Sequence, residues 1–358
     1  MRKPSVLRLI AFLGISVLAL VFARHALVSR VERSDAAMMR QAEALAARWF
    51  TIIEVQKEKV GIEREIPRTV PYAGMIGVEW SPFTTTLGSL DAKRAAANPR
   101  FAALLLRWLH DAGVDSTSTV GILLSGSFPS LGVAALAAVQ TIGAHAVIVS
   151  SLGASSYGAN QPGATWIDLE SWLRREGGLR YASALVTMGA EGDSGGGLSE
   201  EGTALLQEAA RRNSVALSVF PSFEQSVRIK EELLASAHID LLVNIGGNQT
   251  SLGTCRHAGS LPTGLVQRRM HCTDPGRGLI ERCAARGLPV VHLLNIRALA
   301  SQYGLPLLPS RDESSGVDAV FYASRVHRAP LLLILLVLAG LLALWLPPRF
   351  RKDSLCCF

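Results

Sequence analysis

The fold is decided by residues 119–151, which read TVGILLSGSFPSLGVAALAAVQTIGAHAVIVSS. The apolar run at 120–124 has the length of one fully buried strand, and the run at 146–149 has the character of a second. Between them the alanine-rich sequence predicts a helix from 131 to 142, and Gly143 stands where a helix stop is expected. The stretch therefore predicts a strand–helix–strand unit.

The turn that leaves the first strand, SGSFPS at 125–130, is rich in small hydroxyl residues. Pro129 suits the first turn of a helix, where its missing N–H costs no hydrogen bond. The free N–H groups of a helix start, with Ser125 and Ser127 beside them, suit a phosphate or a carboxylate. The turn has neither the lysine of a P-loop nor the glycines of a dinucleotide or nucleophile-elbow motif. It is therefore either an anion site or a turn of small residues that packs a strand against a helix.

The same alternation continues toward the C-terminus. Short apolar runs separated by segments of helical period are typical of strands buried on both faces. The sequence thus predicts an α/β fold, a doubly wound, mostly parallel Rossmann-like sheet with flanking helices. The further strands are expected at 182–187, 215–219, 241–245 and 289–294, and the further helices at 199–212, 223–237 and 278–286.

Four of the predicted strands are followed by loops rich in Gly, Ser, Thr and Asn. In a parallel sheet these loops meet at the carboxyl edge, where open α/β sheets bind ligands. A further hydroxyl-rich loop at 77–91 precedes a helix that Ser89 or Asp91 could cap and that is predicted to continue through 98–111. The candidate ligand-binding residues are Glu79, Ser81, Thr84, Thr85, Ser125, Ser127, Ser155, Ser156, Asn160, Asp193 and Asn248.

The sequence identifies no catalytic residue. Ser127, His292 and Asp193 could be combined into a triad, but His292 falls within a predicted strand and is better explained as a core histidine. Glu191 and Asp193 match no cation-binding motif. No cofactor and no metal is therefore predicted.

The two ends of the chain are apolar and basic. Residues 1–27 contain a short apolar run after a basic start, which fits either a membrane anchor or a cleavable signal peptide. Residues 28–61 contain neither Gly nor Pro before Gly61 and predict a helical stalk, and residues 62–325 form the α/β domain. Residues 329–347 predict a C-terminal transmembrane helix, and 348–358 a basic tail.

Charge gives the expected orientation. The net charge of +7 is spread along the chain without a run of like charge, so nucleic acid is not an expected partner. The basic termini favour a protein of the cell membrane with two spans, cytoplasmic ends and an extracytoplasmic central domain.

The central domain contains an odd number of cysteines, Cys255, Cys272 and Cys283. A Cys255–Cys272 disulfide, free thiols, and a zinc site with His257 and His271 all remain open.

Several long loops resemble, in order, the poly-γ-glutamate system protein family. The resemblance covers roughly residues 70–316. It is carried by EWSPFTTTLGSLDAKR at 79–94, SGSFP at 125–129, SSLGASSYGAN at 150–160 and GGN at 246–248.

This resemblance implies a bacterial membrane-associated protein of the systems that make poly-γ-glutamate, an anionic capsule or secreted polymer. The implied partners are the membrane, the synthesis and export proteins of that system, and the polymer or its precursor. The leading interpretation is an accessory protein whose α/β domain binds polymer or precursor at the carboxyl edge. A hydrolase or transferase acting on γ-glutamyl bonds, with Ser127 as first candidate, and a structural partner of the synthase are the alternatives.

Overall fold

The strand–helix–strand unit that residues 119–151 predict is present in the computed structural model. It consists of β2 (Thr119–Ser125), α5 (Pro129–Ile142) and β3 (His145–Ser151). The two strands are parallel, and Gly143 ends α5 with a φ of 85°. An L-residue with a Cβ avoids that conformation, so glycine is the natural helix stop there.

The structure describes residues 10, 13–19, 21, 28–256, 258–268, 276–308, 319–327, 332 and 334–340. The chain divides into two units. One is the α/β unit, Ser34–Phe321, and the other comprises Met1–Arg33 and Tyr322–Phe358.

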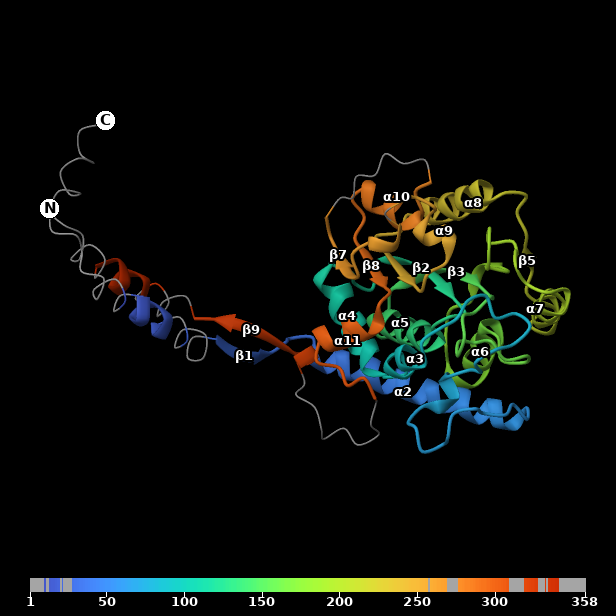
Figure 1. The fold of residues 1–358 in the computed structure, drawn as a ribbon, viewed down its shortest axis with the longest axis horizontal. Coiled ribbons are helices and arrows are strands. Elements are labelled where there is room, and N and C mark those ends of the chain that lie inside the picture. The colour runs from blue at the N-terminus through green and yellow to red at the C-terminus, as the bar shows by residue number, and fades with distance from the viewer. Residues whose placement is uncertain are drawn as a thin grey trace. The chain divides into compact units, whose positions relative to one another are not determined.

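Within the described residues, the sheet of the α/β unit has seven strands in the order β5-β4-β3-β2-β6-β8-β7 (Figure 1). Strands β2 to β6 and β8 pair in parallel, whereas β7 pairs antiparallel with β8. This confirms the mostly parallel α/β sheet flanked by helices. The strands not yet given are β4 (Ser183–Thr187), β5 (Leu217–Ser218), β6 (Leu241–Ile245), β7 (Gly264–Val266) and β8 (Val290–Leu293).

Helices cover both faces of this sheet (Figure 1). On one face, α8 (Phe223–Ser236) and α10 (Leu279–Ala285) pack on alternate strand residues such as Leu123 and Leu242, which are buried. Burial of such side chains on two faces is the main favourable term in folding. The other helices are α2 (Ala36–Lys59), α3 (Leu90–Ala96), α4 (Arg100–Asp111), α6 (Trp166–Trp172), α7 (Glu200–Arg212), α9 (Gln249–Leu252) and α11 (Ile296–Gln302).

The helical stalk expected at 28–61 takes a different form. Val28–Glu32 is a strand, β1, paired antiparallel with β9 (Tyr322–Val326) in the second unit. Helix α2 starts only at Ala36 and belongs to the α/β unit, where Trp49 is fully buried and its Nε1 donates to the carbonyl oxygen of Gly177 at 2.8 Å. The apolar stripe of this helix is thus a packing surface of the α/β unit.

Two further details differ from the prediction. The helix expected to run through 98–111 is divided into α3 and α4, because Pro99 interrupts the intrahelical hydrogen bonds. Ser89 caps α3 by accepting the N–H of Ala92 at 3.3 Å. The edge strand β7 is three residues long and lies below the length at which apolar periodicity can be recognised.

The predicted membrane segments, 1–27 and 329–347, lie largely outside the described residues. No helix among the described residues combines the length and the apolar character that crossing a membrane requires.

Candidate functional site

A cleft of about 560 Å³ opens at the carboxyl edge of the sheet. Its walls are formed by residues that follow β2, β3, β4, β6 and β8, together with the loop at 85–89. In the sheet, β2 has β3 as its neighbour on one side and β6 on the other. After β2 the chain builds the sheet outward through β3, β4 and β5, and it returns to the opposite side of β2 with β6. The cleft therefore lies at the topological switch point, the place where open α/β sheets bind ligands.

Lys93, on α3, is the cation of this cleft. It is 3% exposed, and its Nζ donates to Ser155 Oγ at 2.8 Å and to the carbonyl oxygen of Ser127. The Nζ also lies 3.9 Å from the centre of the Phe128 ring. Burial lowers the pKa of Lys93 from 10.5 to about 7, and no charged neighbour contributes to the shift. Ammonium and amine forms are therefore both populated near neutral pH.

Two other buried lysines show what distinguishes Lys93. Lys230 forms an ion pair with Asp193 at 2.6 Å, and the two side chains are 1% and 0% exposed. Lys57, on α2, donates to Gln161 Oε1 at 2.8 Å, and burial together with Arg64 lowers its pKa to about 7. Neither of these two lysines lines the cleft. Among the buried lysines of the described chain, Lys93 is the one that contacts a serine hydroxyl in a cleft.

The serines beside Lys93 have different tasks. Ser127 Oγ accepts the backbone N–H of Ser155 at 3.1 Å, so Ser127 holds the chain that carries Ser155. Ser155 lines the cleft, and the described structure gives its Oγ a single hydrogen-bond partner, Lys93. Gly88 lies over this pair, since a Cβ at Gly88 would be 3.2 Å from Ser155 Oγ.

Backbone pairing brings the 77–91 loop to the cleft. Thr85 N donates to Ala154 O at 2.9 Å, and Ser156 N donates to Thr86 O at 2.9 Å. Asn160 Nδ2 adds hydrogen bonds to Val78 O and to Thr84 Oγ1. The loop therefore lies along the segment after β3, and α3, which follows it, delivers Lys93 to the cleft.

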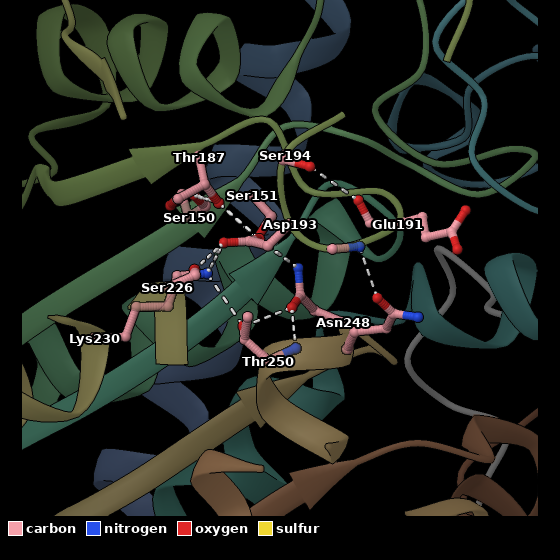
Figure 2. Close-up of polar contacts among 12 residues, drawn as sticks. Ser150, Ser151, Thr187, Glu191, Asp193, Ser194, Ser226, Lys230, Asn248 and Thr250 are labelled. Carbon is pink, nitrogen blue, oxygen red and sulfur yellow. Dashed lines mark hydrogen bonds and ion pairs between the residues drawn. The ribbon is translucent and has the colours of Figure 1, made fainter. Parts of the chain in front are cut away.

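A buried polar network supports the opposite wall (Figure 2). Asp193 has a φ of 62° and accepts hydrogen bonds from Ser226 and Lys230 on α8, both at 2.6 Å. It also accepts from Thr187 at the end of β4 and from Asn248 after β6. The network ties the loops after β4 and β6 to the end of β4 and to α8, so that the cleft has a rigid wall.

The cleft wall includes five of the residues that sequence reasoning proposed, and the others lie around it. Asn160 and Asp193 act as internal hydrogen-bonding groups, and Glu79 is exposed outside the cleft. Ser81 and Thr84 bond one another within the 77–91 loop, and Ser156 Oγ donates to Thr86 O at 3.5 Å. The five in the wall are Thr85, Ser125, Ser127, Ser155 and Asn248.

Sequence reasoning did not single out Lys93, although it lies within the 79–94 run. A lysine early in a predicted helix is normally solvated. The available signal was the hydroxyl-rich loop before it, which could have suggested that the start of the next helix faces the same edge.

The possible Ser127, His292 and Asp193 triad is not assembled. His292 Nδ1 lies 3.0 Å from Asn244 Nδ2 inside the sheet, and burial lowers its pKa to about 4. Asp193 is engaged by Lys230. The possible Cys255–Cys272 disulfide involves Cys272, which lies outside the described residues, whereas Cys255 Sγ donates to Glu281 Oε2 at 3.2 Å.

No protein-family model, curated protein or solved structure matches this chain.

Proposed function

We propose that this protein is a membrane-anchored accessory protein of poly-γ-glutamate biosynthesis or export, and that its α/β unit binds the polymer or a precursor in the cleft. The proposal includes two membrane spans and an extracytoplasmic α/β unit. It rests on the resemblance of the loops and on the chemistry of the cleft. The observation that carries it is Lys93, a buried cation that lines the cleft without a carboxylate partner among the described residues.

A carboxylate ligand suits the electrostatics of Lys93. A buried ammonium group without a counter-ion is unfavourable, because burial removes its hydration. A carboxylate entering the cleft would supply the missing charge and form a charge-assisted hydrogen bond. The ligand would thereby raise the pKa of Lys93, so Lys93 takes up a proton when the ligand binds above neutral pH.

The cleft also offers the neutral donors that an amide-linked polymer needs. Thr86, Leu87 and Gly88 line it, and their backbone N–H groups have no hydrogen-bond partner within the described residues. The same holds for the N–H groups of Ser127 and Phe128, which precede α5. Each unit of a γ-glutamyl chain carries one carboxylate and one amide, and this set of donors can satisfy both.

The test is calorimetric titration of the full chain, purified in a mild detergent, with a short, chemically defined γ-glutamyl oligomer. Because a hydrogen bond to a charged group contributes about 1.5–3 kcal/mol, Lys93→Met should weaken binding about tenfold to a hundredfold. Lys57→Met is the matched control, because Lys57 is equally buried and lies away from the cleft. It should leave the affinity unchanged.

Two results would contradict the proposal. One is that oligomers of every length fail to bind the wild-type chain. The other is that Lys93→Met and Lys57→Met both bind the oligomer as tightly as the wild type does. The oligomer would then bind outside the cleft.

A further inference from the structure

We propose that Ser155 and Lys93 form a nucleophile–base pair, and that the cleft catalyses acyl transfer on an amide or ester that carries a carboxylate. The substrate class rests on the proposed function, because it assumes that the cleft admits γ-glutamyl compounds. The pair itself rests on the geometry of the two side chains and on the neutral surroundings of Lys93.

The geometry meets the first requirement of a serine nucleophile. Ser155 Oγ lies 2.8 Å from Lys93 Nζ, within the distance at which a proton is transferred between a nucleophile and its base. Both side chains line the cleft, so a ligand there reaches the pair. Serine–lysine pairs are one of the known variants of nucleophile and base.

Lys93 can keep its contacts in the neutral form that a base requires. An amine has two N–H donors and one lone pair. It can donate to the carbonyl oxygen of Ser127 and accept the O–H of Ser155 at the same time. The Ser127 carbonyl therefore orients the lone pair toward the nucleophile.

The surroundings favour the amine form near neutral pH. Burial lowers the pKa of Lys93 to about 7. Its neighbours are neutral: the Phe128 ring, Ser127, Ser155 and the backbone of Gly88. Glu191 is the other titratable side chain among the described residues that line the cleft, and it is exposed. On α3 itself, Asp91 and Arg94 pair with one another.

The reaction is balanced without any further reagent except water or an amine. Ser155 Oγ attacks the carbonyl carbon and forms a C–O bond, while its proton moves to Lys93 Nζ. The tetrahedral intermediate breaks the bond to the leaving amine or alcohol, which takes the proton from Lys93. Water or an acceptor amine then attacks the Ser155 ester and gives its proton to Lys93, and Ser155 regains a proton as it leaves. The N–H groups of Ser127 and Phe128, which have no hydrogen-bond partner in the described part of the chain, are the candidate donors to the oxyanion.

The pair explains why the neighbouring hydroxyl is a poorer candidate. Ser127 Oγ accepts an N–H from Ser155, and no side-chain base contacts it in the described structure. Ser127 is therefore a positioning residue, and Ser155 is the nucleophile.

The experiment is labelling of the full chain with a fluorophosphonate, which reacts with activated serines whatever their natural substrate is. Attack by Ser155 Oγ forms a P–O bond and releases fluoride, while Lys93 takes the proton. Peptide mass spectrometry should place the label on Ser155, and Ser155→Ala should remove it. Because a general base contributes about 10²–10⁴-fold, Lys93→Met should slow labelling at least about a hundredfold.

A second variant removes the base at residue 93 and keeps the positive charge. Lys93→Arg keeps a positive charge but cannot act as a base at neutral pH. It should lose labelling, whereas Lys57→Met, which lies away from the cleft, should be labelled as the wild type is. In the wild type, the labelling rate should rise with pH and level off above a midpoint near the lowered pKa of Lys93, about 7.

Absence of label, or label on Ser127, would overturn the pair. A labelling rate that does not change with pH would also overturn it. If the oligomer still binds in any of these cases, the proposed binding function stands and only the chemistry fails. If labelling occurs at Ser155 but no oligomer binds, the pair stands and the proposed ligand is wrong.

Discussion

Replacing Lys93 with methionine should make the protein more stable in mild acid, even though it removes two hydrogen bonds. In the folded chain burial lowers the pKa of Lys93 from 10.5 to about 7. Between these two pH values the unfolded chain binds more protons than the folded one, so stability rises with pH across this window. Below pH 7 Lys93 is charged in both states, and the folded chain bears the full cost of burying that charge.

The size of the effect follows from the shift. One pKa unit corresponds to about 1.4 kcal/mol, so the charged Lys93 costs about 5 kcal/mol below pH 7. Methionine is apolar and adaptable in shape, so it fills the same space, and the two lost hydrogen bonds cost about 1 kcal/mol each. The variant should therefore exceed the wild type by about 3 kcal/mol in free energy of unfolding near pH 6.

The assay is urea unfolding of both proteins from about pH 6 to about pH 9.5, followed by tryptophan fluorescence. The difference between the two proteins isolates Lys93, because Lys57 and Lys230 titrate in both. The advantage of Lys93→Met should shrink as the pH rises through the window above 7. A difference that stays constant with pH, or a variant less stable at every pH, would refute the description of Lys93 as a buried, unpaired amine.

Three further predictions concern the network, the pH dependence and the topology. Asp193→Asn should destabilise the chain by about 3–5 kcal/mol in urea unfolding, because Lys230 would be left as an uncompensated buried charge; a change below about 1 kcal/mol would show that the pair is not needed. In the wild type, affinity for the γ-glutamyl oligomer should fall and the fluorophosphonate labelling rate should rise across the same midpoint, because the first needs Lys93 charged and the second needs it neutral. If the affinity measured by calorimetry and the labelling rate change in the same direction with pH, they do not both depend on the protonation of Lys93, which contradicts the prediction. A reporter fused after Ser354 should be active only in the cytoplasm, and a reporter active outside the cytoplasmic membrane would reverse the orientation.

The central sheet could be predicted from sequence because its signals are local. The strands β2, β3 and β6 are apolar runs of ordinary length, and Gly143 marks a helix end that needs a left-handed residue. The parallel arrangement then follows from the alternation with helices. The strand expected at 215–219 is shorter in the structure, where β5 has two residues, and the three-residue antiparallel β7 carries too few side chains to show a period.

The candidate site could be predicted only as an edge of the sheet. Loops that follow parallel strands must meet at that edge, and residues such as Ser125, Ser155 and Asn248 do line one cleft. Which side chain can bind or react with a ligand at this edge depends on where the tertiary fold places it. Lys93 reaches the cleft because the 77–91 loop carries α3 to Ser127 and Ser155. No pattern within α3 shows that its lysine is buried.

Asp193 shows how a candidate carboxylate can be occupied within the protein itself. Its position after a predicted strand makes this carboxylate a candidate for ligand binding. In the structure its oxygens accept hydrogen bonds from Ser226, Lys230, Thr187 and Asn248. A carboxylate that is fully satisfied within the protein supports the wall of a cleft and has no capacity left for a ligand.

Ligand binding in the cleft is tested most directly by a structure of the full chain with a bound γ-glutamyl oligomer. We expect a ligand carboxylate within hydrogen-bonding distance of Lys93 Nζ, in the cleft between the 85–89 loop and the segment after β6. An oligomer bound elsewhere on the chain, with the cleft empty and Lys93 still bonded only to Ser127 and Ser155, would contradict it.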